Sequence, residues 1–279
     1  IGPGHIATGI LMTTFAMYLA FEMDINPFAT ALYAKLGANA GCASPLAITG
    51  VLAKNLSEPL GYGGFALHLF LSTLLSGFVF TLILYIAYKG FQVKAENPMK
   101  WSDIPKFNRS QRITMTAIGI VVVCCIGFKL DTGLFAFAAA TVLVLLGCVE
   151  EKKAIKGIPW GTLILIVGVG LLVNVITELG GIALISDFLT SFMNEHTAAP
   201  IMAASSGILS WVSSTTGVVM PTMFPIAAEI AQTLQGANYV ELISAITATS
   251  FAAAISPLST GGAIIMSSYS AAREGSHEQ

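Results

Sequence analysis

Long apolar stretches follow one another along almost the whole chain, and short polar segments separate them. Several approach the ~20 residues that a helix needs to cross a bilayer. The stretches cover residues 6–21, 28–53, 65–88, 113–130, 133–149, 158–177, 180–193, 199–231 and 240–270. This pattern predicts an all-α, polytopic membrane protein.

The stretch at 199–231 is too long for one span, and the polar sequence SSTTG at 213–217 interrupts it. Dividing the stretch there leaves two arms of about 13–15 residues, each too short to cross a bilayer. We therefore expect a re-entrant hairpin, which enters and leaves on the same side of the membrane.

Two other stretches carry interruptions that resemble each other. GCASPLAITGVLA at 41–53 and AAISPLSTGGAII at 253–265 both contain Ser-Pro-Leu followed shortly by Thr-Gly. Proline removes a backbone donor and glycine releases the helix, so each stretch is predicted to form two half-helices around an unwound centre. A simple proline kink would explain one such segment, but two in corresponding positions are typical of transporters with internal repeats.

A polar segment precedes each of these predicted broken helices: GPGHIATG at 2–9 and SSTTG at 213–217. The order predicts two inverted repeats. Residues 1–92 would hold the rest of the first repeat, 93–112 a cytoplasmic linker, and 113–279 the second repeat with hairpin 199–231 and broken helix 240–270. The comparison also predicts that the chain lacks the start of the first repeat and the last helix of the second, a naturally minimal protein being the alternative.

Composition agrees with a membrane protein. Hydrophobic residues make up 55% and charged residues 10% of the 279, whereas a soluble domain carries roughly a quarter charged residues. Lipid is therefore an expected partner, and the absence of a basic stretch interleaved with aromatic residues argues against nucleic acid. The four cysteines lie in apolar stretches without CxxC spacing, so neither a zinc site nor a disulfide framework is supported.

The charge distribution predicts the orientation. Lys and Arg gather in 89–112 and in 150–157, whereas 178–197 contains acidic residues and no Lys or Arg. The positive-inside rule then places 89–112 and 150–157 in the cytoplasm of a multi-pass protein of the cell (inner) membrane.

Unwound segments at membrane depth are tolerated where they line a cavity or hold a ligand. Half-helix N-termini favour anions, and carbonyl and hydroxyl oxygens suit Na⁺. None of the interrupted segments contains Asp, Glu, Lys or Arg. This argues against a proton-relay antiporter built on carboxylates and predicts that backbone and hydroxyl groups hold the ligand.

The segments GPGHIATG, GANAGCASPLAITG, SSTTGVVMPT and ISPLSTGG resemble the motifs of the divalent-anion/sodium symporter group of the ion transporter superfamily. The likeness is greatest to its dicarboxylate carrier branch of the malonate-carrier type. The resemblance implies an elevator-type carrier, usually a homodimer, that takes up small di- or tricarboxylates with Na⁺ as coupling ion and needs no other cofactor.

In that group a Ser-Asn-Thr signature at each hairpin tip binds Na⁺ and the substrate carboxylate. Ser213, Ser214 and Thr215 resemble the second signature with Ser in place of Asn, and Gly4, His5 and Ile6 stand at the first. The resemblance thus implies a substrate and ion site made of Gly4, His5, Ser44, Pro45, Thr49, Ser213, Ser214, Thr215, Ser256, Pro257, Ser259 and Thr260. Within this set, Na⁺ would lie at Ser213, Ser214, Thr215 and Ser256.

The departures from the signature leave a proton as the alternative coupling ion. His5 could contact the anion, take a proton in place of Na⁺, or cap the hairpin turn. If the site is correct, residues 213–217 should approach residues 256–261.

Other functions fit less well. An ion or oxyanion exchanger of the same superfamily would share the hairpins and carry different substrates. No catalytic residues are predicted, because the chain has neither the GxSxG motif of serine hydrolases nor the HExxH motif of zinc proteases. A structural membrane subunit would not explain two matched helix breaks.

Overall fold

The computed structural model of the protein describes residues 5–93, 107–128, 130–156, 158 and 160–277, which form helices and connecting turns without a β-strand among them. The chain divides into two compact units: unit 1, with residues 3–97 and 161–279, and unit 2, with residues 98–160. The all-α prediction is confirmed for the described residues. The predicted domain boundaries, with a linker at 93–112, rest on the internal repeats, whereas the two units are defined by compactness. The predicted boundaries therefore stay a prediction.

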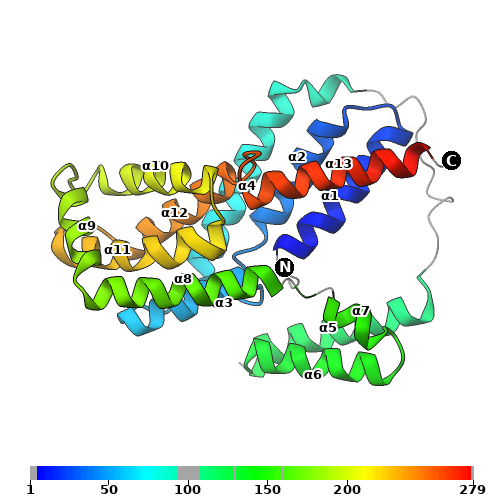
Figure 1. Ribbon diagram of the computed structural model, residues 1–279, viewed down its shortest axis with the longest axis horizontal. Coiled ribbons are helices and arrows are strands. Elements are labelled where there is room, and N and C mark those ends of the chain that lie inside the picture. The colour runs from blue at the N-terminus through cyan, green and yellow to red at the C-terminus, as the bar shows by residue number, and fades with distance from the viewer. Residues whose placement is uncertain (1–4, 94–106, 129, 157, 159, 278–279) are drawn as a thin grey trace. The chain divides into compact units, whose positions relative to one another are not determined.

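Unit 1 contains most of the helices (Figure 1). They are α1 (His5–Glu22), α2 (Pro27–Ala40), α3 (Ile48–Ser57), α4 (Ala66–Ala87), the body of α8 (Trp160–Glu178), α9 (Gly181–Thr190), α10 (Ala198–Trp211), α11 (Met220–Thr233), α12 (Tyr239–Ala253) and α13 (Thr260–His277). Short 3₁₀ turns lie at Glu58–Leu60 and Gly90–Gln92, and a π-helical turn at Thr215–Val219. Unit 2 contains α5 (Arg109–Phe128), α6 (Thr132–Leu145) and α7 (Glu151–Lys156).

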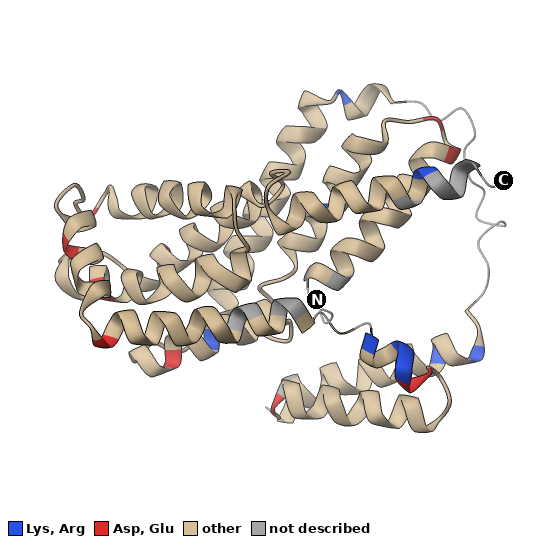
Figure 2. Cartoon of the chain, viewed as in Figure 1, with Lys and Arg blue, Asp and Glu red and all other residues tan. Residues whose placement is uncertain are grey.

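Large apolar side chains point outward from several helices. On α4, Leu75 and Phe78 are each 64% exposed, and Ile164 on α8 is 70% exposed. Lys and Arg gather instead on and beside α7, while α4, α6 and α10 carry no charged residue (Figure 2). A surface of this kind suits contact with hydrocarbon rather than with water.

Within the described part of the chain, α4 is the single helix that is long and apolar enough to cross a bilayer unaided. A second candidate is the pair Val167–Glu178 and Gly181–Thr190, which is bent by 79° at a short break. Three of the other apolar stretches, 28–53, 199–231 and 240–270, are divided into shorter helices, as the polar, proline and glycine interruptions predict.

The stretch predicted as a hairpin is divided where the sequence indicates. Helices α10 and α11 have 14 residues each and flank residues 212–214 and the π-helical turn. Both helices pack against α12. The two short arms agree with the prediction, and whether the hairpin is re-entrant in a membrane stays a prediction.

The segments α2–α3 and α12–α13 begin in the same way. The side chain of Asn26 caps α2 by accepting hydrogen bonds from the N–H groups of Phe28 and Ala29, at 3.0 and 3.1 Å. The side chain of Asn238 caps α12 by accepting from the two N–H groups that follow at the same spacing, at 2.9 and 3.4 Å. The separation between the two asparagines equals that between Ser44 and Ser256, so the structural likeness begins well before the Ser-Pro-Leu motifs.

The helix interruptions at 41–47 and 254–259 also share their geometry. Ser44 and Ser256 each accept a hydrogen bond from the N–H three residues later, at 2.9 Å in both segments. A Cβ atom on Gly50 would lie 2.0 Å from the Ser44 carbonyl oxygen, and one on Gly262 would lie 2.0 Å from that of Ser256. The structure thus pairs Gly50 with Gly262, one residue away from the Thr-Gly pairing that residue types alone suggested.

The end of α3 is joined to the start of α12 by a small aromatic cluster. The Ser57 and Tyr239 hydroxyls are 2.8 Å apart in a buried hydrogen bond. The Tyr62 ring stacks on the Tyr239 ring with centroids 3.9 Å apart. These contacts hold the second half of one interrupted segment against the first half of the other.

We predict that Gly50→Ala destabilises the protein by about 3 kcal/mol, because the added methyl group overlaps backbone atoms that cannot move aside. Gly37→Ala is the matched control, since Gly37 lies on α2 with no atom within 4 Å of the added Cβ and alanine favours a helix by up to about 1 kcal/mol. Thermal unfolding of the detergent-solubilised protein measures both. Equal unfolding midpoints for the two variants would contradict the close approach at Gly50.

Candidate functional site

The turn between α10 and α11 brings its polar side chains into the interior of unit 1. Ser214, Thr215 and Thr216 are 6%, 3% and 1% exposed. The Ser214 hydroxyl accepts a hydrogen bond from the Gly217 N–H at 3.2 Å and so caps the helical turn that begins at Thr215. A capped turn of this kind leaves other N–H groups of the helix start available to a ligand.

A narrow cavity lies beside this turn, and distant parts of unit 1 form its walls. Its free volume is about 10 Å³, which is close to the room that one water needs. The lining residues are Ile6, Lys35, Asn39, Ser213, Ser214, Thr215, Phe251, Ala254, Thr260, Gly261 and Ile264. Residues 213–215 and 260–261 therefore border one cavity, as the sequence led us to expect.

Lys35 is the unusual member of this lining, because its side chain is only 1% exposed. Its Nζ donates a hydrogen bond to Asn39 Oδ1 at 3.1 Å. No carboxylate oxygen of the described residues lies within 4.0 Å of that Nζ. A buried ammonium without an opposite charge is costly, so the entry of an anion into the cavity would be favourable.

Two glycines make room for the lysine side chain. A Cβ on Gly9 would lie 3.0 Å from Lys35 Nζ, and one on Gly261 would lie 3.2 Å from Lys35 Cε. Gly9 comes from α1 and Gly261 from the first turn of α13. The end of the Lys35 side chain thus lies close to the backbone of two segments, α1 and the start of α13, which are far apart in the sequence.

Helix starts meet at the same cavity. The helical turn at Thr215 and helix α13 at Thr260 both begin among its lining residues. The first N–H groups of a helix lack partners within the helix and carry the positive end of its dipole. Together with Lys35, they form a concave site suited to a carboxylate or another anion.

Three buried oxygens lie close together next to this cavity. The Ser210 and Thr215 hydroxyls are 3.1 Å apart and lie 2.7 and 3.2 Å from the Ser250 carbonyl oxygen. Hydroxyl and carbonyl oxygens are ligands that suit a small hard cation. In the structure they are hydrogen-bonded to one another.

The structure brings together only some of the predicted site residues. Ser213, Ser214, Thr215 and Thr260 line the cavity, whereas Ser44, Pro45, Thr49, Ser256, Pro257 and Ser259 do not. Pro45 and Pro257 are exposed, and the Ser259 hydroxyl donates to the Ala254 and Ser256 carbonyl oxygens, at 2.6 and 2.7 Å. Gly4 lies outside the described residues, and His5 is described only as the first residue of α1. Of the four residues predicted to bind Na⁺, Ser213, Ser214 and Thr215 line the cavity, whereas Ser256 does not.

The sequence-based prediction missed Lys35 and Asn39. It assumed a site without charged side chains, because the interrupted segments themselves contain none. Lys35 lies six residues before the break at Gly41, and it is the one charged residue in the apolar stretch 28–53. An ionisable residue within such a stretch is itself a sign of a functional site.

Helices with exposed apolar surfaces around a cavity that contains a buried lysine and several hydroxyl groups are features of a membrane transport protein. The sequence profile of the citrate transporter family (CitMHS) matches residues 6–254. The chain belongs to this family, and it is therefore an integral membrane protein of a carboxylate transporter class. Neither a curated protein nor a solved structure matches the chain. The narrower resemblance to the malonate-carrier branch stays a prediction.

We predict that Gly9→Ala lowers the affinity for citrate roughly three- to tenfold, or ~0.7–1.4 kcal/mol, because the new methyl group displaces the Lys35 ammonium. The far end of a lysine side chain can move, so the variant should still fold. The citrate-dependent rise of the thermal unfolding midpoint measures the affinity. Gly119→Ala, where no atom lies within 4 Å of the added Cβ, should behave as the unaltered protein. An unchanged affinity in Gly9→Ala would contradict the proximity of Gly9 to an anion site.

Proposed function

We propose that the protein is a secondary active transporter of citrate and related small di- or tricarboxylates, with its substrate site at the Lys35 cavity. The observation that carries this proposal is the buried Lys35 ammonium, which has no carboxylate partner among the described residues. The family supports the substrate class.

One substrate carboxylate would bind Lys35 Nζ and the free N–H groups at the starts of α13 and the Thr215 turn. The Ser213, Ser214 and Thr260 hydroxyls, which line the same cavity, would bind the remaining oxygens. An ammonium–carboxylate hydrogen bond is stronger than a neutral one, and the exclusion of water strengthens it further. Lys35 would therefore provide affinity, and the hydroxyl groups would provide selectivity.

A cavity of about 10 Å³ holds a water but not a citrate, so its walls must separate when the substrate binds. The α10–α11 hairpin and the first turn of α13 both contribute residues to the lining. We propose that these interrupted segments open the site to one side of the membrane at a time. Inverted repeats that move as an elevator within a homodimer are the corresponding architecture.

For coupling, we propose that Na⁺ binds at the Ser210 and Thr215 hydroxyls and the Ser250 carbonyl oxygen, which already lie 2.7–3.2 Å from one another. Lys35 favours a second candidate, coupling to a proton. A buried lysine can release its proton when the negative charge of the substrate leaves and regain it when a substrate binds. We also propose that 89–112 and 150–157 face the cytoplasm.

The function is tested by uptake of labelled citrate, malonate and succinate into proteoliposomes that contain the whole protein. Separate arms apply a sodium gradient, a proton gradient or neither. We expect uptake of at least citrate, driven by one of the two gradients. Uptake of none of the three acids would exclude carboxylate transport, and transport of inorganic oxyanions instead would favour the exchanger alternative. Uptake that follows only the proton gradient would exclude sodium as the coupling ion.

A substitution series isolates the role of the lysine. We predict that Lys35→Met weakens citrate binding at least about thirtyfold, because removing one partner of a buried charge-assisted hydrogen bond costs ~2–5 kcal/mol. Lys35→Arg should restore only part of the affinity, since the larger guanidinium does not fit between Gly9 and Gly261. Isothermal titration with citrate measures both variants.

Lys54→Met is the matched control. Lys54 Nζ lies 3.5 Å from Glu58 in a surface ion pair, and its side chain is 61% exposed, so the loss of its charge should leave citrate binding unchanged. Equal affinities for Lys35→Met and the unaltered protein would exclude the Lys35 cavity as the anion site.

A further inference from the structure

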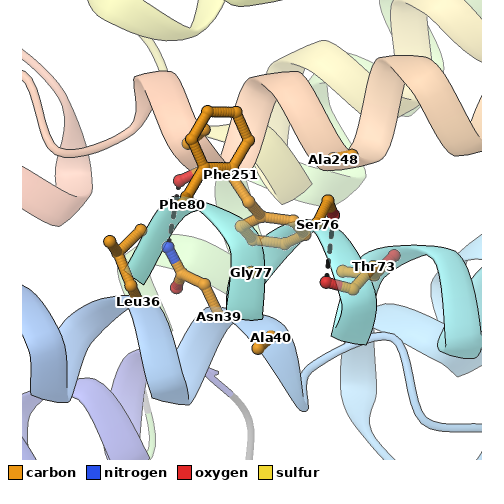
Figure 3. A pocket seen from close by; sticks show the side chains of 10 residues that line it. Leu36, Asn39, Ala40, Thr73, Ser76, Gly77, Phe80, Ala248 and Phe251 are labelled. Carbon is orange, nitrogen blue, oxygen red and sulfur yellow. Dashed lines mark hydrogen bonds between the residues drawn. The ribbon is translucent and has the colours of Figure 1, made fainter. Parts of the chain in front are cut away.

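Asn39 lines the Lys35 cavity and also a second cavity. Figure 3 shows this second cavity between α2, α4 and α12, with Asn39 pointing toward Phe251. It also has a free volume of about 10 Å³. In the wall of this cavity Gly77 packs closely against Ala40, so that a Cβ added to Gly77 would lie 2.4 Å from Ala40 Cβ. Asn39 itself is only 2% exposed, so its amide group is fixed by protein contacts rather than by solvent.

Both polar atoms of the Asn39 side-chain amide form hydrogen bonds. Asn39 Oδ1 accepts a hydrogen bond from Lys35 Nζ at 3.1 Å, and Asn39 Nδ2 donates one to the Phe251 carbonyl oxygen at 3.1 Å (Figure 3). Phe251 lies in the last turn of α12, shortly before the interruption at 254–259. Asn39 therefore caps the end of α12 from another helix and, at the same time, holds the lysine.

The two hydrogen bonds connect the Lys35 ammonium to α12, the helix that precedes α13. After Phe251, the chain passes through residues 254–259 and enters α13 at Thr260, which lines the Lys35 cavity. Asn39 and Phe251 are separated by 212 residues, the spacing that also relates Ser44 to Ser256. Equivalent positions of the two interrupted segments thus meet at this bond.

We propose that Asn39 is the positioning residue of the substrate site. It directs the Lys35 ammonium into the cavity and keeps the ammonium in register with the start of α13, so that both bind the same carboxylate. The inference rests on the proposed function and deepens it. A flexible lysine side chain loses less entropy on binding when it is already held in place.

The chemistry of an amide is essential to this role. Asn39 Oδ1 accepts from the ammonium without carrying a negative charge, so the positive charge remains available to a substrate anion. An aspartate in its place would have nearly the same shape but would supply a permanent counterion to Lys35. It would also replace the donor Nδ2 with an oxygen that faces the Phe251 carbonyl oxygen.

The experiment compares Asn39→Asp, Asn39→Ala and the control Thr73→Val in proteoliposomes containing the whole protein, with initial rates of citrate uptake over a range of concentrations. Thr73 borders the same second cavity, but its hydroxyl donates to the Leu69 carbonyl oxygen of its own helix. We expect Asn39→Asp to raise KM for citrate by about tenfold or more, with Vmax within about threefold, because an internal counterion competes with the substrate. Asn39→Ala should raise KM by about fivefold through loss of positioning. Thr73→Val should leave KM unchanged.

A second measurement distinguishes positioning from packing. In a Lys35→Met background, Asn39→Ala should have no further effect on citrate binding by titration, because Asn39 acts through the lysine side chain. A KM within twofold of the unaltered protein in Asn39→Asp, or in Asn39→Ala should Asn39→Asp not fold, would overturn the inference while leaving the proposed function intact. Equal effects of Thr73→Val and Asn39→Asp would also overturn it. Absence of carboxylate uptake by the unaltered protein would refute the proposed function and the inference together.

Discussion

The transfer of one ammonium group from water into an apolar interior is the constraint around which unit 1 is arranged. Such a transfer costs several kcal/mol unless the charge finds partners. In the described structure Lys35 has a neutral partner in Asn39, two glycines that leave space for its side chain, and helix starts nearby that favour anions. Because these features concentrate on one buried side chain, the proposed anion site and the packing of unit 1 depend on the same residues.

The helix interruptions serve the same arrangement. An interruption inside a membrane is unfavourable by itself, because it leaves N–H and C=O groups without helix partners where water is scarce. Serine hydroxyls within the breaks satisfy part of this demand: Ser214 accepts from the Gly217 N–H and Ser259 from the Gly262 N–H. The remaining demand is met across the structure, as where Asn39 binds the carbonyl oxygen of Phe251. Segments far apart in the chain therefore have to assemble before the site exists.

Membership of the citrate transporter family gives the class of function, and the structure adds a chemical reason for it. A lysine, free N–H groups and hydroxyl groups form a site with positive and neutral donors, which complements a carboxylate. The three oxygens of Ser210, Thr215 and Ser250 form a separate group of acceptors close by. An anion site and a cation-adapted group that share Thr215 would allow the binding of one ion to alter the binding of the other.

The sequence by itself determined the helical class, the division of 199–231 into two short helices and the interruptions at the two Ser-Pro-Leu motifs. Proline, glycine and polar runs act on the backbone within a few residues, so their effects are readable locally. Only the tertiary structure decided which side chains share a cavity. Ser256 and Ser213 both belong to the predicted sodium set, yet Ser256 does not line the cavity, whereas Lys35 does, although it lies outside every interruption. The direction of a side chain depends on how helix faces pack against distant segments, and that information is spread over residues that are neighbours only in the folded protein.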